Sequence, residues 1–250
     1  MVTKKNKPSI TPIKKAEKSE NDIKVNSIRQ ATARFPIVGI GASAGGLAAF
    51  EALFRAMPAD TDMNMAFLVV QHLAPAHKSI LCELLQRYTP MPVIQVEDGV
   101  VVKPNCVYII PPNRFMAFIN GTLQLLEPLT PRGHPFSIDF LFRSLAQDLR
   151  ERAICIILSG TGSDGTLGLR EIKAEGGMTM VQSMGTCEFD GMPNCAINTG
   201  LVDYVLSPAD MPSQLLTYSK YAYDKPRITT TPPESQTDNF VKKLFVLMRV

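Results

Sequence analysis

The chain has 250 residues, enough for one good-sized hydrophobic core with tails. Its net charge is +3, but residues 1–35 hold nine basic and three acidic side chains, so the rest of the chain is acidic. A nucleic-acid-binding domain is therefore disfavoured. No apolar run approaches the ~20 residues of a membrane span, and the five cysteines include no C-x-x-C pair. We expect a cytoplasmic protein without membrane insertion or a nucleic-acid partner.

Residues 1–34 have no sustained hydrophobic period and predict a disordered basic tail. The first ordered elements are an apolar strand at 37–40 and a helix that ends near Met57, with only Gly, Ala and Ser between them. Two interpretations of this turn stay open. Gly41-Ala-Ser-Ala-Gly45 fits the G-x-S-x-G turn that exposes a nucleophilic serine. Gly39-Ile-Gly41-Ala-Ser-Ala44 fits a loose dinucleotide-binding fingerprint.

The next strand, at 65–72, favours the nucleophile interpretation of the turn. A dinucleotide site requires an acidic residue at the end of this strand, to bind the ribose hydroxyls. The strand ends instead in Gln71-His72, so that an acid is missing and a base is present.

The remaining pattern alternates strands and helices, and it predicts an α/β fold with a doubly wound, mainly parallel sheet. Asn120-Gly121 is a strong hairpin signal and indicates an antiparallel hairpin insert at about 100–127. Ser137 is the expected N-cap of a helix that carries Asp139 in its first turn. Further strands are expected at 93–96, 105–110, 114–119, 122–126, 153–158, 178–181 and 204–206, and further helices at 78–88, 166–175 and 208–221.

Functional sites of such sheets gather beyond the carboxyl ends of the strands. Ser43, His72 and Asp164 each follow a predicted strand, and together they are the residue types of a nucleophilic triad. Each also has a simpler interpretation. Ser43 could be a turn serine, His72 a structural histidine, and Asp164 the N-cap of the helix that follows it. Their joint placement favours the triad, because triads are defined by geometry and role rather than by order in the chain.

These residues give the chain a resemblance to the catalytic domain of CheB-type chemotaxis methylesterases, from about residue 35 to 221. The resemblance implies a protein-glutamate methylesterase that hydrolyses glutamate γ-methyl esters, and in some members deamidates glutamine, on the cytoplasmic helices of methylated chemoreceptors. It maps the catalytic serine, histidine and aspartate onto Ser43, His72 and Asp164. The motifs that carry it are Gly41-Ala-Ser-Ala-Gly-Gly46, Gln71-His72, Pro111-Pro112, Ser159-Gly-Thr-Gly-Ser-Asp-Gly165 and Gly191-Met-Pro193 with Ala196-Ile197.

Ester hydrolysis by such a triad requires donors for an oxyanion, and the backbone N–H groups of Ala44, Gly45 and Thr161 are the candidates. The chemistry needs no metal and no cofactor, and no Cys/His cluster in the sequence suggests a metal. The alternative is a non-catalytic regulatory or docking module that retains the methylesterase fold.

The ends of the chain depart from the family pattern. The segment before residue 35 is too short for the phosphoacceptor receiver domain that often precedes this domain. Residues 132–139 are closer to the version in proteins that fuse a methylesterase-like domain to a methyltransferase. Residues 35–222 are therefore the expected methylesterase domain, 223–239 a linker, and 240–250 the start of an amphipathic helix. Two interpretations of this helix stay open: it begins a further domain, or it docks on the methylesterase domain or on a partner. A methyltransferase domain or another chemotaxis protein is an expected partner.

Overall fold

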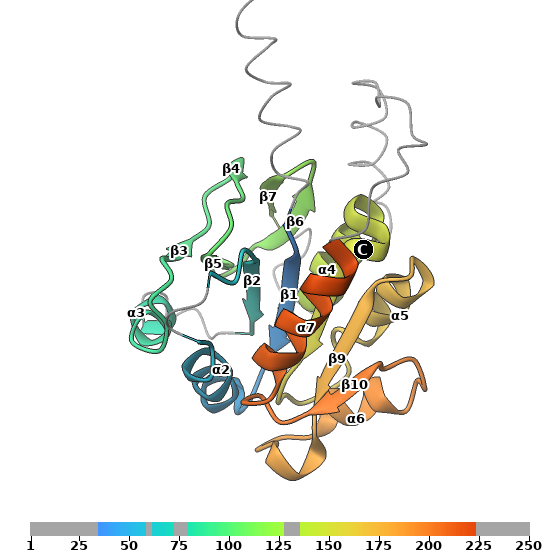
Figure 1. Cartoon of the computed structure of the whole chain (residues 1–250). Helices are drawn as coiled ribbons and strands as arrows, with labels where there is room; N and C mark the ends of the chain where they lie inside the picture. The colour runs from blue at the N-terminus through green and yellow to red at the C-terminus, as the bar shows by residue number, and fades with distance from the viewer. Residues whose placement is uncertain (1–34, 59–61, 73–79, 128–135, 224–250) are drawn as a thin grey trace, which may run out of the picture.

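The computed structural model describes residues 35–58, 62–72, 80–127 and 136–223 (Figure 1). The predicted tail at 1–34, almost all of the linker at 223–239 and the helix at 240–250 lie outside these residues. Within them, no helix is both long enough and apolar enough to cross a membrane.

A seven-stranded sheet forms the centre of the molecule, with the order β10-β9-β8-β1-β2-β5-β3. Every neighbouring pair is parallel, which confirms the predicted doubly wound α/β fold. β8, β9 and β10 follow one another outward on one side of β1, and β2, β5 and β3 lie on its other side. The strand order therefore reverses at β1, and crossover helices cover both faces. The strands are β1 (Ile37–Ala42), β2 (Ala66–Gln71), β3 (Val93–Gln95), β5 (Cys106–Ile109), β8 (Ala153–Ile157), β9 (Met178–Gln182) and β10 (Tyr204–Leu206).

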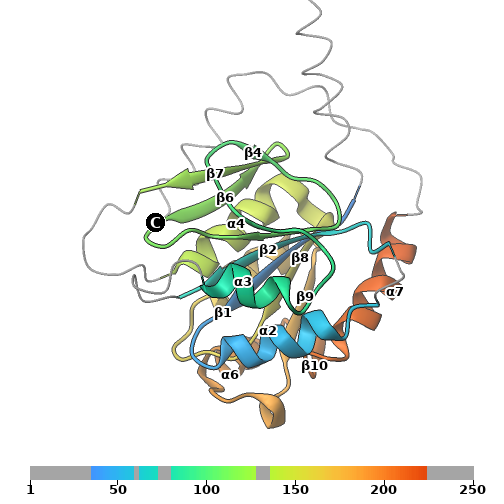
Figure 2. The same cartoon turned by 90° about the vertical axis from the view of Figure 1, so that its left-hand side faces the viewer.

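Alternate residues of the central strands enter two separate cores, as the pleat of a strand buried on both faces requires. On β1, Val38 and Ile40 join one core, whereas Ile37 joins the other. The first core lies under α2 (Gly46–Arg55), α3 (Ile80–Gln86) and α7 (Met211–Tyr223), and the second under α4 (Ser137–Leu149), α5 (Thr166–Ala174) and α6 (Gly191–Ile197) (Figures 1 and 2).

A small antiparallel sheet packs beside α4, in the order β4 (Val100–Val101), β7 (Thr122–Leu126), β6 (Phe115–Ile119). The predicted hairpin joins β6 to β7, and both Asn120 and Gly121 have positive φ, as its tight turn requires. The range of the insert needs one correction. β5 lies inside 100–127 but pairs in parallel with β2 and β3, because its apolar residues are buried in the main sheet.

Glycines let α4 lie unusually close to β1. A Cβ on Gly41 would lie 2.2 Å from Cγ2 of Ile138, and one on Gly39 would lie 2.7 Å from Cδ1 of Leu145. Both glycines are inside the strand, paired with β2 and β8. The absence of side chains here brings the first turn of α4 to the edge of the sheet where β1 ends.

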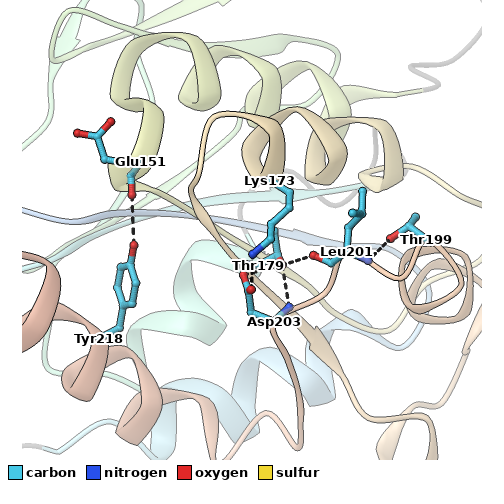
Figure 3. Close-up of polar contacts among 7 residues, drawn as sticks. All are labelled: Glu151, Lys173, Thr179, Thr199, Leu201, Asp203 and Tyr218. Atoms are coloured by element: carbon cyan, nitrogen blue, oxygen red, sulfur yellow. Dashed lines mark hydrogen bonds and ion pairs between the residues drawn. The ribbon is translucent and has the colours of Figure 1, made fainter.

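A polar cluster at the opposite, amino-terminal edge holds the outermost strand and the last helix in place (Figure 3). The Asp203 carboxylate forms an ion pair with Lys173 of α5 and accepts hydrogen bonds from the backbone N–H (2.9 Å) and hydroxyl (3.1 Å) of Thr179. The hydroxyl of Tyr218 on α7 donates to the Glu151 carbonyl at 3.2 Å. These contacts hold β10 and α7 against the rest of the fold. Because the contacts lie far from the carboxyl edge of the sheet, we expect them to contribute to the stability of the fold rather than to the site.

The close approach of α4 to β1 gives a stability prediction for Gly41→Ala. The added methyl group would overlap Ile138, so we expect a loss of about 1–3 kcal/mol in the free energy of unfolding, measured by urea denaturation. Gly185→Ala is the control, because a Cβ there meets nothing within 4 Å. A Gly41→Ala protein as stable as the control would contradict the packing of α4 on β1.

Candidate active site

The carboxyl ends of β1, β2 and β8 lie side by side and bring the predicted residues into one region. Ser43 follows β1 and His72 follows β2, and the parallel register pairs Ala42 with Gln71 immediately before them. The backbone N–H of His72 donates to the Ala42 carbonyl at 3.3 Å. The N–H of Ser43 donates to the carbonyl of Ser159, the second residue after β8, at 3.0 Å. The backbone therefore fixes the positions of Ser43 and His72 relative to each other and to the loop that carries Asp164.

His72 and Asp164 form a direct side-chain contact. Nε2 of His72 lies 2.9 Å from Oδ2 of Asp164, and the two side chains are 32% and 6% exposed. Because Nε2 is engaged by the carboxylate, Nδ1 is the nitrogen left to act on another group. Within the described residues, no hydrogen bond joins Ser43 to His72. Catalytic hydrogen bonds are commonly long in free enzymes and tighten only when substrate binds.

The Asp164 carboxylate also caps a helix that is distant in the sequence. Its oxygens accept hydrogen bonds from the backbone N–H groups of Ile138 (3.0 Å), Asp139 (2.9 Å) and Gly165 (2.8 Å). The first two groups belong to the first turn of α4, where free N–H groups favour a carboxylate. The buried charge of Asp164 is therefore matched by three backbone donors and by His72.

The predicted N-cap of α4 is wrong as a result, and so is the alternative interpretation of Asp164 as an N-cap. Ser137 is the first residue of α4 rather than its N-cap, because Asp164 already binds the free N–H groups of that turn. Asp164 is not the N-cap of α5, since Gly165 occupies that position in a left-handed conformation. Both errors have one physical cause, because the cap comes from a separate part of the chain.

Asp139 lies in the first turn of α4, as predicted, and it is 1% exposed. Its Oδ1 accepts a hydrogen bond from the Gly168 N–H at 2.7 Å, whereas its Oδ2 is buried with no hydrogen-bond partner among the described residues. Burial raises the pKa of Asp139 to about 6, and the nearby charge of Asp164 adds to the increase.

The turn that carries Ser43 bends sharply at Gly45, whose φ is +71°. A Cβ at Gly45 would lie 2.7 Å from both Cβ of Glu188 and Oγ of Ser159, so no larger residue fits. Among the hydrogen bonds of the described residues, none uses the backbone N–H groups of Ala44, Gly45 or Thr161 as donors. The first two precede α2, whose N-terminus favours negative charge. These groups can bind an oxyanion, and their role stays a prediction.

Ser159 is a further site residue, which lies in one of the sequence motifs but has no role predicted from the sequence. Its hydroxyl lies 2.9 Å from the Ala44 carbonyl and 3.0 Å from the Phe189 N–H, so it joins the Ser43 turn to the loop before α6. Its backbone N–H donates to the side chain of buried Gln182 at 2.8 Å. Only the fold reveals this connection, because Ser159 is distant in the sequence from the other three residues.

The structure disfavours the dinucleotide-binding interpretation of the turn. That fingerprint requires glycines that let a pyrophosphate approach the backbone. Gly39 and Gly41 instead lie within β1, and the space beside them is filled by α4.

Among the described residues, no group of three His, Cys, Asp or Glu side chains could hold a metal ion.

Comparison with known proteins agrees with this geometry. The CheB methylesterase family model matches residues 38–215. A protein-glutamate methylesterase/protein-glutamine glutaminase of Photorhabdus laumondii is 33% identical over 214 residues, covering 84% of this chain and 58% of the relative. An uncharacterized 104.1 kDa protein of Rhodobacter capsulatus is 40% identical over 126 residues, which are 50% of this chain and 13% of that protein.

A solved structure gives the same assignment. The crystal structure of the Thermotoga maritima CheB methylesterase catalytic domain superposes with a TM-score of 0.68 at 31% sequence identity. The match covers 74% of this chain and 98% of that domain. The chain spans only about half the length of the curated methylesterases that it matches, with 58% and 46% for two of them. On these similarities, the chain belongs to the CheB methylesterase family.

Proposed function

We propose that this protein is a protein-glutamate methylesterase, a hydrolase that cleaves γ-methyl esters of glutamate side chains with Ser43 as nucleophile. The observation that carries the proposal is the hydrogen bond between His72 and the buried Asp164, with Ser43 at the end of the adjoining strand. The contact has the form of a base held by its orienting acid. It occurs in a chain of the CheB methylesterase family.

In the first step, Nδ1 of His72 accepts the proton of the Ser43 hydroxyl while Oγ attacks the ester carbonyl. A serine hydroxyl is a weak nucleophile at its own pKa, so this proton transfer is needed during attack. Asp164 holds the imidazole through Nε2 and stabilises the imidazolium that forms. The three backbone N–H groups on the carboxylate keep Asp164 in place.

The negative charge on the tetrahedral intermediate is bound by the N–H groups of Ala44, Gly45 and Thr161. One donor of this kind typically contributes about 3 kcal/mol to transition-state binding. The α2 dipole adds to the effect, because Ala44 and Gly45 lie at the N-terminus of that helix. Gly45 is needed there because its left-handed conformation directs the turn.

The intermediate then collapses and methanol leaves with the proton held by His72, which produces a glutamyl ester on Ser43. Water attacks this ester with His72 as base, and the serine is regenerated with a free glutamate carboxylate. The same steps with ammonia as leaving group would deamidate glutamine, the second activity for which the relatives are named.

The proposed substrates are the methylated cytoplasmic helices of chemoreceptors, which places the protein in the cytoplasm. A methyltransferase domain or another chemotaxis protein is a proposed partner. The match to a small part of the 104.1 kDa Rhodobacter capsulatus protein supports the idea that domains like this one also occur in longer chains.

The nucleophile is tested by Ser43→Ala with methanol release from a methylated receptor fragment as the measurement. We expect kcat to fall by more than about 1,000-fold, since only the oxyanion donors and binding remain. Ser213→Ala on α7 is the matched control and should release methanol at the wild-type rate. Equal methanol release by wild type and Ser43→Ala would exclude Ser43 as the nucleophile. If both proteins fold but neither releases methanol, the alternative of a non-catalytic docking module would be favoured.

Asp164 is expected to have two roles that substitutions can separate. Asp164→Asn keeps one oxygen, which can still accept from the Asp139 and Gly165 N–H groups, but it removes the charge and the acceptor of the Ile138 N–H. We expect kcat to fall by about 10,000-fold, with a smaller loss of stability than in Asp164→Ala. Asp164→Ala should lose as much activity and also about 2 kcal/mol of unfolding free energy, because buried donors lose their partner. Urea denaturation and methanol release measure the two effects. Equal stability of both variants would contradict the capping role.

A further inference from the structure

Two carboxylates cap each other's helices at the active-site edge. Asp164, which directly precedes the α5 turn, accepts hydrogen bonds from the first turn of α4. Asp139, in that first turn of α4, accepts a hydrogen bond at 2.7 Å from Gly168 in the first turn of α5. Each helix therefore supplies the N-terminal cap of the other. Helix capping groups of this kind fix the direction in which the chain enters a helix.

The two helices are also in close steric contact at this point. A Cβ on Gly168 would lie 2.5 Å from Cβ of Phe142 and 3.0 Å from the carbonyl oxygen of Asp139. A shift of α5 relative to α4 would thus break the Asp139–Gly168 hydrogen bond or create a clash. Since Asp164 is only four residues before Gly168, such a shift would move its carboxylate relative to His72.

We propose that Asp139 is a positioning residue, which fixes the Asp164 carboxylate against His72 by holding the start of α5 to the start of α4. The role rests on the proposed function, because it assumes that His72 and Asp164 activate Ser43. Asp139 acts through Asp164 and does not itself touch the reacting atoms. A displacement of the order of 1 Å in such a group can reduce a rate about 100-fold.

The environment of Asp139 argues against a purely stabilising role. The side chain is almost fully buried, and one carboxylate oxygen has no hydrogen-bond partner among the described residues. The charged groups that act on it are Asp164, which raises its pKa, and Arg143 on the same helix, which lowers it. A buried carboxylate beside a second one is costly for folding. The charge therefore costs stability, whereas the proposed role uses only the oxygen that accepts from the Gly168 N–H.

The test compares Asp139→Ala, which removes the acceptor, with Asp139→Asn, which keeps an oxygen for the Gly168 N–H. Two rates are measured: methanol release with kcat and KM resolved, and sulfonylation of Ser43 by phenylmethylsulfonyl fluoride, followed by mass spectrometry. The sulfonylation rate reports activation of the serine without any receptor substrate. Asp148→Asn, an acid on α4 beyond the first turn, is the matched control.

For Asp139→Ala we expect kcat and the sulfonylation rate to fall about tenfold or more, with KM changed less than about twofold. Asp139→Asn should keep both rates within about threefold of wild type, as should the control. If the alanine variant does not fold, Asp139→Glu replaces it, because its extra methylene displaces the carboxylate and should lower both rates.

Three results would overturn the proposal. They are wild-type rates in Asp139→Ala, equal losses in the alanine and asparagine variants, and a wild-type protein whose Ser43 is not sulfonylated. A wild type that is sulfonylated at Ser43 but releases no methanol would contradict only the proposed substrate. The sulfonylation rates of the variants would still decide the role of Asp139.

The pKa of Asp139 gives a separate stability prediction. The folded pKa, about 6, lies above the ordinary value of about 4, so between these values the folded protein binds more protons than the unfolded chain. The contribution of Asp139 to stability is therefore lost as the pH rises from about 4 to about 6. Asp139→Asn should raise Tm more at pH 7 than at pH 4, and an equal difference at both pH values would contradict a buried titrating carboxyl.

Discussion

The Asp164 carboxylate binds three backbone N–H groups and one imidazole nitrogen, and the arrangement of the carboxyl edge depends on these four contacts. A buried carboxylate loses its hydration, and only a full set of donors compensates for that loss. Here two donors come from the start of α4, one from the chain entering α5, and one from His72 at the end of β2. The same contacts that make the charge tolerable also fix the direction of the imidazole. Stability and site geometry are therefore coupled through one side chain.

The close packing around β1 makes this coupling possible. Gly39 and Gly41 bring α4 down onto the strand, and its first turn thereby reaches the edge where Asp164 lies. On the opposite face of the sheet, α2 begins directly after the Ser43 turn, so its free N–H groups point to the same edge. Ser159 joins that turn to the loop before α6 through its hydroxyl. The nucleophile turn, the base and the acid are consequently held by the backbone of three adjacent strands.

Much of this arrangement follows from local sequence patterns. The apolar strands predict the parallel sheet, and the positions of Ser43, His72 and Asp164 after three of them predict a shared edge. The errors arise where a distant segment decides a local structure. Ser137 has the residue type of an N-cap, but Asp164, which lies 25 residues after Asp139, fills that role. β5 follows a short strand without an intervening helix, yet its burial places it in the main sheet. The link through Ser159 and the mutual capping by Asp139 have no local signal, because each depends on how the helices pack.

The tautomer of His72 tests the central claim most directly, because it reports which nitrogen Asp164 holds. Among the three histidines of the chain, the signals of His72 can be assigned in nitrogen-15 NMR spectra by comparison with a His72→Gln variant. In the neutral imidazole we predict a proton on Nε2, bonded to Asp164, and a bare Nδ1 that can accept the Ser43 proton. The same tautomer should be less populated in Asp164→Asn. A proton on Nδ1 in the wild-type protein would contradict the account, because the nitrogen assigned to the serine could no longer act as a base.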